Sequence, residues 1–268
     1  MRLHNALRLA LMNGDAKEAE IAYRELADFD ASHRWLPHAR TLIAALQTPA
    51  PANTDEGLAV LTRLEAEWTP AAHAVLGKDS RDMLLRIWRS VGDALADRMF
   101  DPELPDSHAS YAYSKCEDWL SVERCVRAVP DFSAQPVLLA RIAEAVWRQR
   151  RWKEAACHWF EICWSAPDRF QSLMDRGEIP DPIFRDGWNC GQDQDVKPEI
   201  SPPWFPAWML LHEPKIAELI PAPTANGSPQ AAFAVLRALS IGNGEDADMR
   251  RQLQRLHPGL LACFLSRR

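Results

Sequence analysis

The 268-residue chain lacks four well-known catalytic signatures that a single stretch of sequence can carry. It contains no G-x-S-x-G elbow, no Walker loop, no glycine-rich dinucleotide turn after a strand and no H-E-x-x-H zinc motif. Distant residues can assemble an active site without a motif, so these absences do not exclude an enzyme. They favour a non-catalytic protein that uses no cofactor.

A basic surplus and long apolar runs are also missing. The chain has 37 acidic and 31 basic residues and a formal net charge of −6. Binding to duplex nucleic acid normally requires a concentrated basic face, so we expect neither nucleic acid nor a membrane as partner. No uncharged apolar run approaches the roughly 20 residues that cross a bilayer. The apolar N-terminal stretch is interrupted by Arg8 and does not resemble an export signal, so we expect a cytoplasmic protein with six reduced cysteines.

Sequence patterns that form β-sheets are scarce. The chain has only three tyrosines, and no segment alternates Val, Ile, Thr and Tyr with polar residues over a useful length. Residues 53–68 and 80–100 instead carry apolar residues three to four apart, namely Leu58, Leu61, Leu64 and Trp68, then Leu84, Leu85, Trp88, Val91, Leu95 and Met99. Asn53 and Glu56 predict a capping box, and Pro37 predicts the first turn of a helix that runs to about Gln47. The chain is therefore predicted to be all-α.

Proline, glycine and aspartate concentrate in residues 175–206. We predict an irregular loop here, between a repeat region at 1–174 and a C-terminal helical region at 207–268. Helices are expected around 206–219, 229–240 and 246–266. The loop carries five acidic residues, but not in the order of a calcium loop, so a solvated acidic segment is expected: Asp181, Asp186, Asp193, Asp195 and Glu199. If the protein is instead an enzyme of unknown reaction, its site would lie at this loop.

Aromatic residues occur in the loop and directly after it. Phe184, Trp188, Trp204 and Phe205 are expected to pack the loop if it is not itself functional. Trp204, Phe205 and Trp208 form either a second contact surface or an anchor for the loop on the C-terminal helices, and we favour the anchor because large aromatics near a helix start usually bury.

Two segments of the chain share a pattern. Residues 13–32 and 150–169 align Lys17-Glu18-Ala19 with Lys153-Glu154-Ala155, Tyr23 with Trp159 and Leu26 with Ile162. Each follows a predicted helix, which spans residues 1–12 in one case and begins at Pro136 in the other. Trp152 follows the turn, Pro167 closes the second unit, and Trp119 marks a weaker unit 33 residues before Trp152. This pattern resembles the tetratricopeptide repeat, whose period is about 34 residues. The match covers residues 1–32 and 105–168.

The resemblance implies stacked antiparallel helical hairpins, an α-solenoid, whose first helices line a groove that binds a peptide. The polar residues expected to face that groove are Arg141, Glu144 and Arg148 in one unit and His4, Asn5 and Arg8 in the other. Arginine can grip a carboxylate or phosphate through paired N–H donors, so the expected partner is a protein or peptide that carries acidic groups. The lysine-and-asparagine clamp of chaperone-binding members is not reproduced. An ordinary solvated helix face is the alternative, and the surface could also serve self-association.

Cysteine and histidine cluster within RRWKEAACHWFEICWSAP, residues 150–167, and raise the question of a metal site. Cys157 and Cys163 are six residues apart, which does not match the Cys-x2–4-Cys pairs of structural zinc sites. Cys157 and His158 point about 100° apart on a helix. We therefore expect packing residues and no metal. Ala155, Trp159 and Ile162 are predicted to form a buried stripe.

Overall fold

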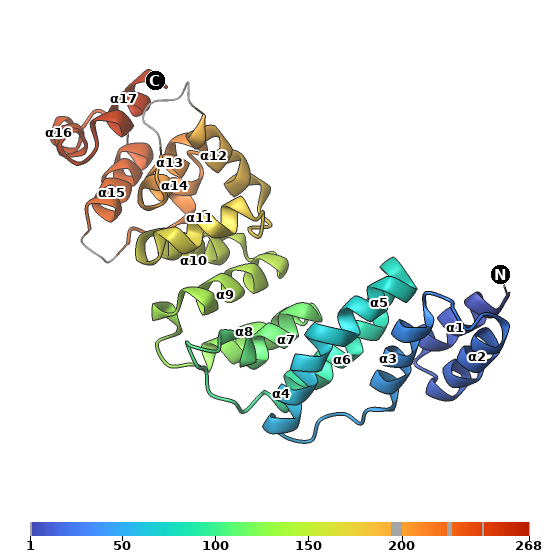
Figure 1. Cartoon of the computed structure of the whole chain (residues 1–268). Coiled ribbons are helices and arrows are strands. Elements are labelled where there is room, and N and C mark those ends of the chain that lie inside the picture. Colours follow the sequence, from blue (N-terminus) through green and yellow to red (C-terminus); the bar gives the residue numbers. More distant parts are fainter. Residues whose placement is uncertain (1, 194–199, 224–226, 243, 268) are drawn as a thin grey trace. The chain divides into compact units, whose positions relative to one another are not determined.

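The computed structural model describes residues 2–193, 200–223, 227–242 and 244–267 (Figure 1). Within these ranges the chain is helical and forms no β-strand, as predicted. The chain forms two compact units, residues 1–129 and 130–268. The predicted boundaries at 174 and 206 both fall inside the second unit. In the part of the chain that is described, no helix has both the length and the apolar character that a membrane crossing requires.

The first unit is built from helices α1 to α8. Their bounds are α1 Arg2–Asn13, α2 Ala16–Phe29, α3 Leu36–Gln47, α4 Thr54–Arg63, α5 Thr69–Leu76, α6 Arg81–Ala94, α7 Ala109–Lys115 and α8 Trp119–Arg127. A π-helical turn, Leu64–Trp68, joins α4 to α5, and a 3₁₀ turn, Gly77–Ser80, joins α5 to α6. Neighbouring helices pack in sequence order, α1 on α2, α2 on α3 and α6 on α7, while α4 packs on α6.

The second unit is built from helices α9 to α17. Their bounds are α9 Pro136–Arg148, α10 Trp152–Ser165, α11 Pro167–Asp175, α12 Pro182–Gln192, α13 Phe205–His212, α14 Ile216–Leu219, α15 Ser228–Ile241, α16 Ala247–Leu256 and α17 Pro258–Ser266. Helices α9 and α10 pack against each other, α13 packs on α15, and α15 packs on α16. The core is rich in aromatic rings: Phe184 lies 4.9 Å from Trp159, 5.3 Å from Phe160 and 5.8 Å from Phe205, measured between ring centroids.

Helix starts follow the capping residues that the sequence provides. The side chain of Asn53 accepts a hydrogen bond from the backbone N–H of Glu56 at 3.0 Å, and the Glu56 carboxylate accepts from the backbone N–H of Ala52 at 2.8 Å. This arrangement confirms the predicted cap of α4. Pro37 lies in the first turn of α3, which ends at Gln47 as predicted. Aspartates cap four other helices in the same way: Asp15 for α2, Asp118 for α8, Asp181 for α12 and Asp246 for α16.

Several sequence predictions were wrong in detail. Residues 182–192 form helix α12 inside the segment predicted to be irregular, because Asp181 caps it and Pro182 occupies its first position, where a missing N–H costs nothing. Met99 was placed on the apolar stripe of α6, but that helix ends at Ala94 and the Met99 side chain is 85% exposed. The helices expected at 206–219 and 246–266 are each broken in two, the first at residues 213–215, which include Pro214, and the second at His257, which precedes Pro258.

Candidate functional site

The polar stripe predicted on α9 lies on a partly exposed face of that helix. The side chains of Arg141 and Glu144 are half-buried and that of Arg148 is exposed. The Arg148 guanidinium lies 3.1 Å from the Glu144 carboxylate and 5.3 Å from the ring centroid of Trp147. Its charge is thus balanced within the helix. Surface pairs at this spacing contribute only about 0.3–0.5 kcal/mol, so the pair itself leaves Arg148 able to change partner.

The residues predicted on α1 belong to the other unit and mostly serve packing. Arg8 donates to the Asp79 carboxylate at 2.7 Å and to the Leu76 carbonyl at 3.4 Å, which ties α1 to the turn before α6. The His4 ring lies 4.5 Å from that of His33. Burial, followed by the charge of His33, lowers the pKa of His4. Asn5 is exposed. Of these three residues, only Asn5 is exposed, while His4 and Arg8 are half-buried.

The cysteine-rich stretch is the interior of α10. Ala155, Trp159 and Ile162 are buried, which confirms the predicted stripe. Cys163 has no exposed surface, and burial raises the pKa of its thiol well above the usual range. Among the residues that the structure describes, no three His, Cys, Asp or Glu side chains come together in a way that would hold a metal ion.

The acidic residues predicted in the 175–206 segment are dispersed. Asp181 is buried and caps α12, while the Asp186 carboxylate lies 3.1 Å from the His212 Nε2 atom. Asp193 is exposed, and Asp195 and Glu199 lie outside the described residues. Within the described residues, the hydrogen-bond partners of the Asp181 and Asp186 carboxylates are nitrogen atoms. These two residues therefore do not form a cation site together.

The aromatics of this segment and of α13 bury, as the anchoring interpretation predicts. Phe184, Trp188, Phe205 and Trp208 belong to the core, and the Trp208 indole N–H donates to the Gly187 carbonyl at 2.9 Å. Trp204 is half-buried, with its ring 4.6 Å from that of His257. Phe205 and Trp208 therefore cannot serve as a contact surface.

A cleft that sequence reasoning missed opens beside α5, α6 and α7 in the first unit. Its volume is about 530 Å³, and twelve residues line it: Glu65, Thr69, His73, Lys78, Ser80, Arg81, Leu84, Leu85, Trp88, Tyr111, Lys115 and Glu117. They are scattered over more than fifty positions of the chain, and no motif links them. The only sequence signal is a set of polar residues opposite the apolar stripe of α6, which every amphipathic helix provides.

The close approach of α6 and α7 shapes one side of this cleft. Gly92 on α6 faces the Tyr113 ring, and a Cβ atom at Gly92 would lie 2.7 Å from Tyr113 Cε1, closer than van der Waals contact permits. The Tyr113 hydroxyl donates to Asp93 at 2.8 Å, and burial raises the pKa of Tyr113. The absence of a side chain at residue 92 thus sets the distance between the two helices.

Four charged groups of the cleft, Glu65, Arg81, Lys115 and Glu117, have partners within it. Arg81 lies 2.6 Å from the Glu117 carboxylate, and the Tyr111 hydroxyl donates to Glu65 at 2.5 Å. The Lys115 ammonium lies 4.9 Å from the Tyr111 ring centroid, a cation–π distance. All these side chains except that of Tyr111 are largely exposed. The cleft therefore presents exchangeable hydrogen bonds and charges around an aromatic side wall.

A serine and a histidine meet in this cleft without the geometry of a nucleophile. Ser80 Oγ is 3.3 Å from His73 Nδ1, but the hydroxyl donates to the Gly77 carbonyl at 2.7 Å. The single hydroxyl proton is thereby directed away from the imidazole that would have to accept it. Ser80 is also only 2% exposed. In this arrangement the pair stabilises the turn between α5 and α6.

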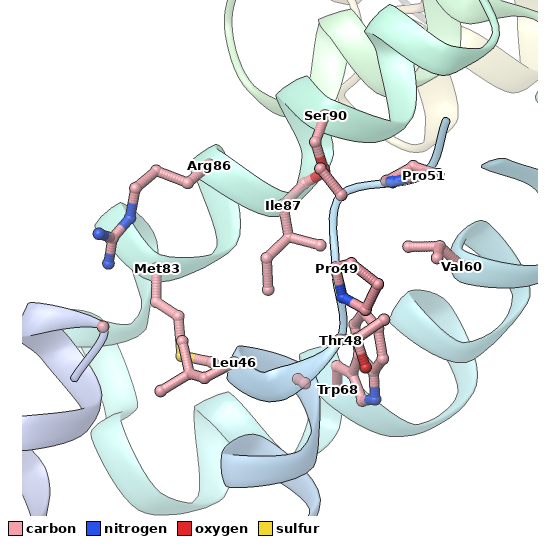
Figure 2. A pocket seen from close by; sticks show the side chains of 13 residues that line it. Leu46, Thr48, Pro49, Pro51, Val60, Trp68, Met83, Arg86, Ile87 and Ser90 are labelled. Atoms are coloured by element: carbon pink, nitrogen blue, oxygen red, sulfur yellow. The ribbon is translucent and has the colours of Figure 1, made fainter. Parts of the chain in front are cut away.

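A second, smaller cavity of about 270 Å³ lies between α3, α4 and α6, under the segment Thr48–Pro51. Figure 2 shows Leu46, Pro49, Met83 and Ile87 around it, with Arg86 to one side. The hydroxyls that line it bond to their own helices, Thr48 to the Ala44 carbonyl and Ser90 to the Ile87 carbonyl. This cavity offers apolar volume and one guanidinium, and its lining contains no carboxylate, thiol or imidazole.

No protein-family model matches the chain, and neither does any curated protein or any solved structure. The interpretation of these surfaces therefore depends on their geometry and chemistry.

Proposed function

We propose that the protein is a non-catalytic interaction module that binds a segment of a partner protein in the cleft beside α5, α6 and α7. The observation that supports this proposal most strongly is the composition of that cleft. Its volume of about 530 Å³ is large enough for several side chains, and paired charges surround its apolar residues, Leu84, Leu85 and Trp88. Protein interfaces combine such a desolvated centre with a polar rim.

Binding is favoured over chemistry because the serine and the two carboxylates of the cleft are engaged. Ser80 is bonded to a backbone carbonyl, and the carboxylates of Glu65 and Glu117 accept from Tyr111 and Arg81. None of these groups pairs a nucleophile with a base that could take its proton. Hydrogen bonds and ion pairs at an exposed rim can instead be exchanged for contacts to a peptide at little net cost.

A stack of helical hairpins similar to tetratricopeptide repeats is the architecture we propose for this module. Two observations support it. Helices α1 and α2 pack against each other, as do α9 and α10. Ala19 and Ala155, aligned in the repeat comparison, have no exposed surface on the second helix of each pair, as a close helix crossing requires. In this proposal Arg141, Glu144 and Arg148 of α9 form an additional polar contact stripe.

Selection of a randomised displayed peptide library on the purified chain tests the proposal. Enriched peptides are synthesised, and their affinity is measured by isothermal titration calorimetry for the wild type and for three double variants. Arg81→Ala/Lys115→Ala alters the cleft, Arg141→Ala/Arg148→Ala alters the α9 stripe, and Lys17→Ala/Arg24→Ala removes one lysine and one arginine from the exposed face of α2 as a matched control.

We expect the cleft variant to weaken binding about tenfold, which corresponds to about 1.4 kcal/mol, and the control to leave it unchanged. Circular dichroism establishes that each variant is folded. Peptides that bind the cleft variant as tightly as the wild type would refute the cleft as the site, and loss of binding in the α9 variant alone would move the site to that helix. Failure to enrich any peptide would count against the interaction function.

A further inference from the structure

A second groove lies in the other unit, at the turn between α9 and α10. It has a volume of about 700 Å³ and a largely apolar lining, and it is bounded by the first turns of α10 and by the end of α14: Arg150, Arg151, Trp152, Lys153, Glu154, Cys157, Leu219 and Pro221. All its lining residues belong to the second unit. The groove is thus a surface separate from the cleft of the first unit, and an inference about it does not depend on that cleft.

The rim of this groove is positively charged. Three basic residues and one acidic residue line it, which gives a formal charge of +2 on a chain whose total is −6. Arg151 is compensated, because its guanidinium lies 2.5 Å from the Glu154 carboxylate. Arg150 and Lys153 are exposed and form no ion pair with any residue in the described ranges. Binding of an external carboxylate to Arg150 and Lys153 therefore breaks no ion pair within the described residues.

Arg150 follows the end of α9 in a strained backbone conformation. Arg150 has a left-handed conformation with φ +63°, and it donates its backbone N–H to the Trp147 carbonyl at 2.8 Å where α9 ends. Such a residue terminates a helix and is usually glycine or asparagine. An arginine here accepts backbone strain and places a guanidinium at the rim of the groove.

The floor of the groove is apolar and accessible. Leu219 at the end of α14 is 44% exposed, and Pro221 beyond it is also exposed. Trp152 also lines the groove and is half-buried, with its indole nitrogen buried and its ring partly exposed. An exposed leucine beside a partly exposed tryptophan ring is a surface on which an apolar side chain would fit.

We infer that this groove binds an acidic segment of a partner protein, in which an apolar side chain lies between carboxylates. The apolar side chain contacts Leu219 and Trp152, and the carboxylates pair with Arg150 and Lys153. Charge complementarity selects this occupant over a basic peptide or a nucleic acid duplex. A duplex would require a basic face larger than this rim.

Fluorescence anisotropy with synthetic peptides tests the inference on the full chain. The probe is a fluorescein-labelled peptide with two leucines flanked by glutamates, and the comparison peptides carry glutamine or lysine in place of every glutamate. We expect the glutamate peptide to bind at least about tenfold more tightly than the glutamine peptide and to weaken as salt is added, because the attraction is ionic.

Variants of the groove locate the binding. Arg150→Glu/Lys153→Glu reverses both available cations, and Arg185→Glu/Arg255→Glu makes the same change at two exposed arginines of the same unit outside the groove. We expect a loss of about tenfold or more in the first variant and no change in the second. Leu219→Ser removes the apolar contact without changing charge and should also weaken binding, by a few-fold.

Cys157 supplies a local readout that does not depend on these variants. Its half-buried thiol lines the groove, burial raises the pKa of that thiol, and its alkylation by iodoacetamide can be followed by mass spectrometry. Bound peptide should slow alkylation of Cys157 and leave that of Cys116, in the first unit, unchanged.

Three results would overturn the inference. The first is equal binding of the glutamate and lysine peptides, and the second is unchanged affinity in the folded Arg150→Glu/Lys153→Glu variant. The third is a concentration-dependent dimer in sedimentation equilibrium that Leu219→Ser dissociates, because the occupant would then be a second copy of this chain. Failure of the cleft variant in the library experiment leaves this inference intact, since none of its groups lies in the groove.

Discussion

The buried carboxylate of Asp181 ties α12 to α9, and its removal should destabilise the second unit. Asp181 is 1% exposed. Its Oδ1 atom accepts from the backbone N–H groups of Ile183 at 2.8 Å and Phe184 at 3.3 Å, and its Oδ2 atom accepts from the Trp147 indole N–H at 3.0 Å. One side chain therefore caps a helix and satisfies a donor that lies 34 positions earlier in the chain.

Two losses add in Asp181→Ala. Loss of a helix N-cap costs about 1 kcal/mol, and an indole N–H left unpaired in a partly buried site costs about 1–3 kcal/mol. We expect a total of about 2–4 kcal/mol. Asp181→Asn should cost about 1–3 kcal/mol, because asparagine is an equally good cap but places an amide nitrogen, which is a donor, where Oδ2 accepts from the Trp147 indole N–H.

Urea unfolding followed by circular dichroism measures these losses, and hydrogen exchange reports on the amides of Ile183 and Phe184. A double-mutant cycle with Trp147→Phe isolates the bond between the two elements, and we expect the two changes to be less than additive by about 1 kcal/mol. A cost of Asp181→Ala under about 0.5 kcal/mol would show that the carboxylate does not tie the two helices together, and so would additive mutations with unchanged amide protection.

Three further predictions concern other positions. Gly92→Ala should lower the stability of the first unit by about 1–2 kcal/mol, because overpacking against Tyr113 costs about 1–3 kcal/mol and better helix propensity returns up to about 1 kcal/mol. A variant that is more stable than the wild type in urea unfolding would contradict the close contact between residue 92 and Tyr113. His257 caps α17 by accepting from the Leu260 N–H at 3.1 Å, and burial lowers the pKa of His257. Its contribution to stability should therefore be complete above the unfolded pKa of about 6.5 and be lost as the pH falls towards the lowered folded pKa, and His257→Asn should flatten this pH dependence in urea unfolding. Arg150→Gly should raise the urea midpoint by the equivalent of about 0.5–1 kcal/mol, since glycine adopts φ +63° without strain, and an unchanged or lower midpoint would mean that the arginine is not strained there.

Local signals in the sequence were sufficient to predict most of the helices. The cap at Asn53, the proline in the first turn of α3 and the apolar stripe of α10 depend on residues within one or two helical turns, and their physical basis is local. The break at 213–215 contains Pro214 and the break at His257 precedes Pro258, and the predicted helices ran through both prolines.

The segment 175–206 shows where composition misleads. Its glycines and prolines suggested an irregular loop, yet Asp181 and Pro182 form a helix start, and two glycines of α12 lie in close contact with α13 or with Ile200. Gly187 faces Met209, and Gly191 faces Trp208. These glycines are used for packing between elements, a role that depends on partners distant in sequence.

The sequence by itself determined that the chain is helical and that its cysteine-rich stretch is the interior of a helix, because helical periodicity and capping act over a few residues. Only the tertiary structure decided which polar residues gather at a surface. It brought Glu65, Arg81 and Tyr111 into one cleft and placed Leu219 beside Trp152, whereas it used Arg8 and Asp181 for packing. Contacts between distant segments depend on how helices cross, and crossings are set by side-chain volumes on both partners, which no single stretch of sequence contains.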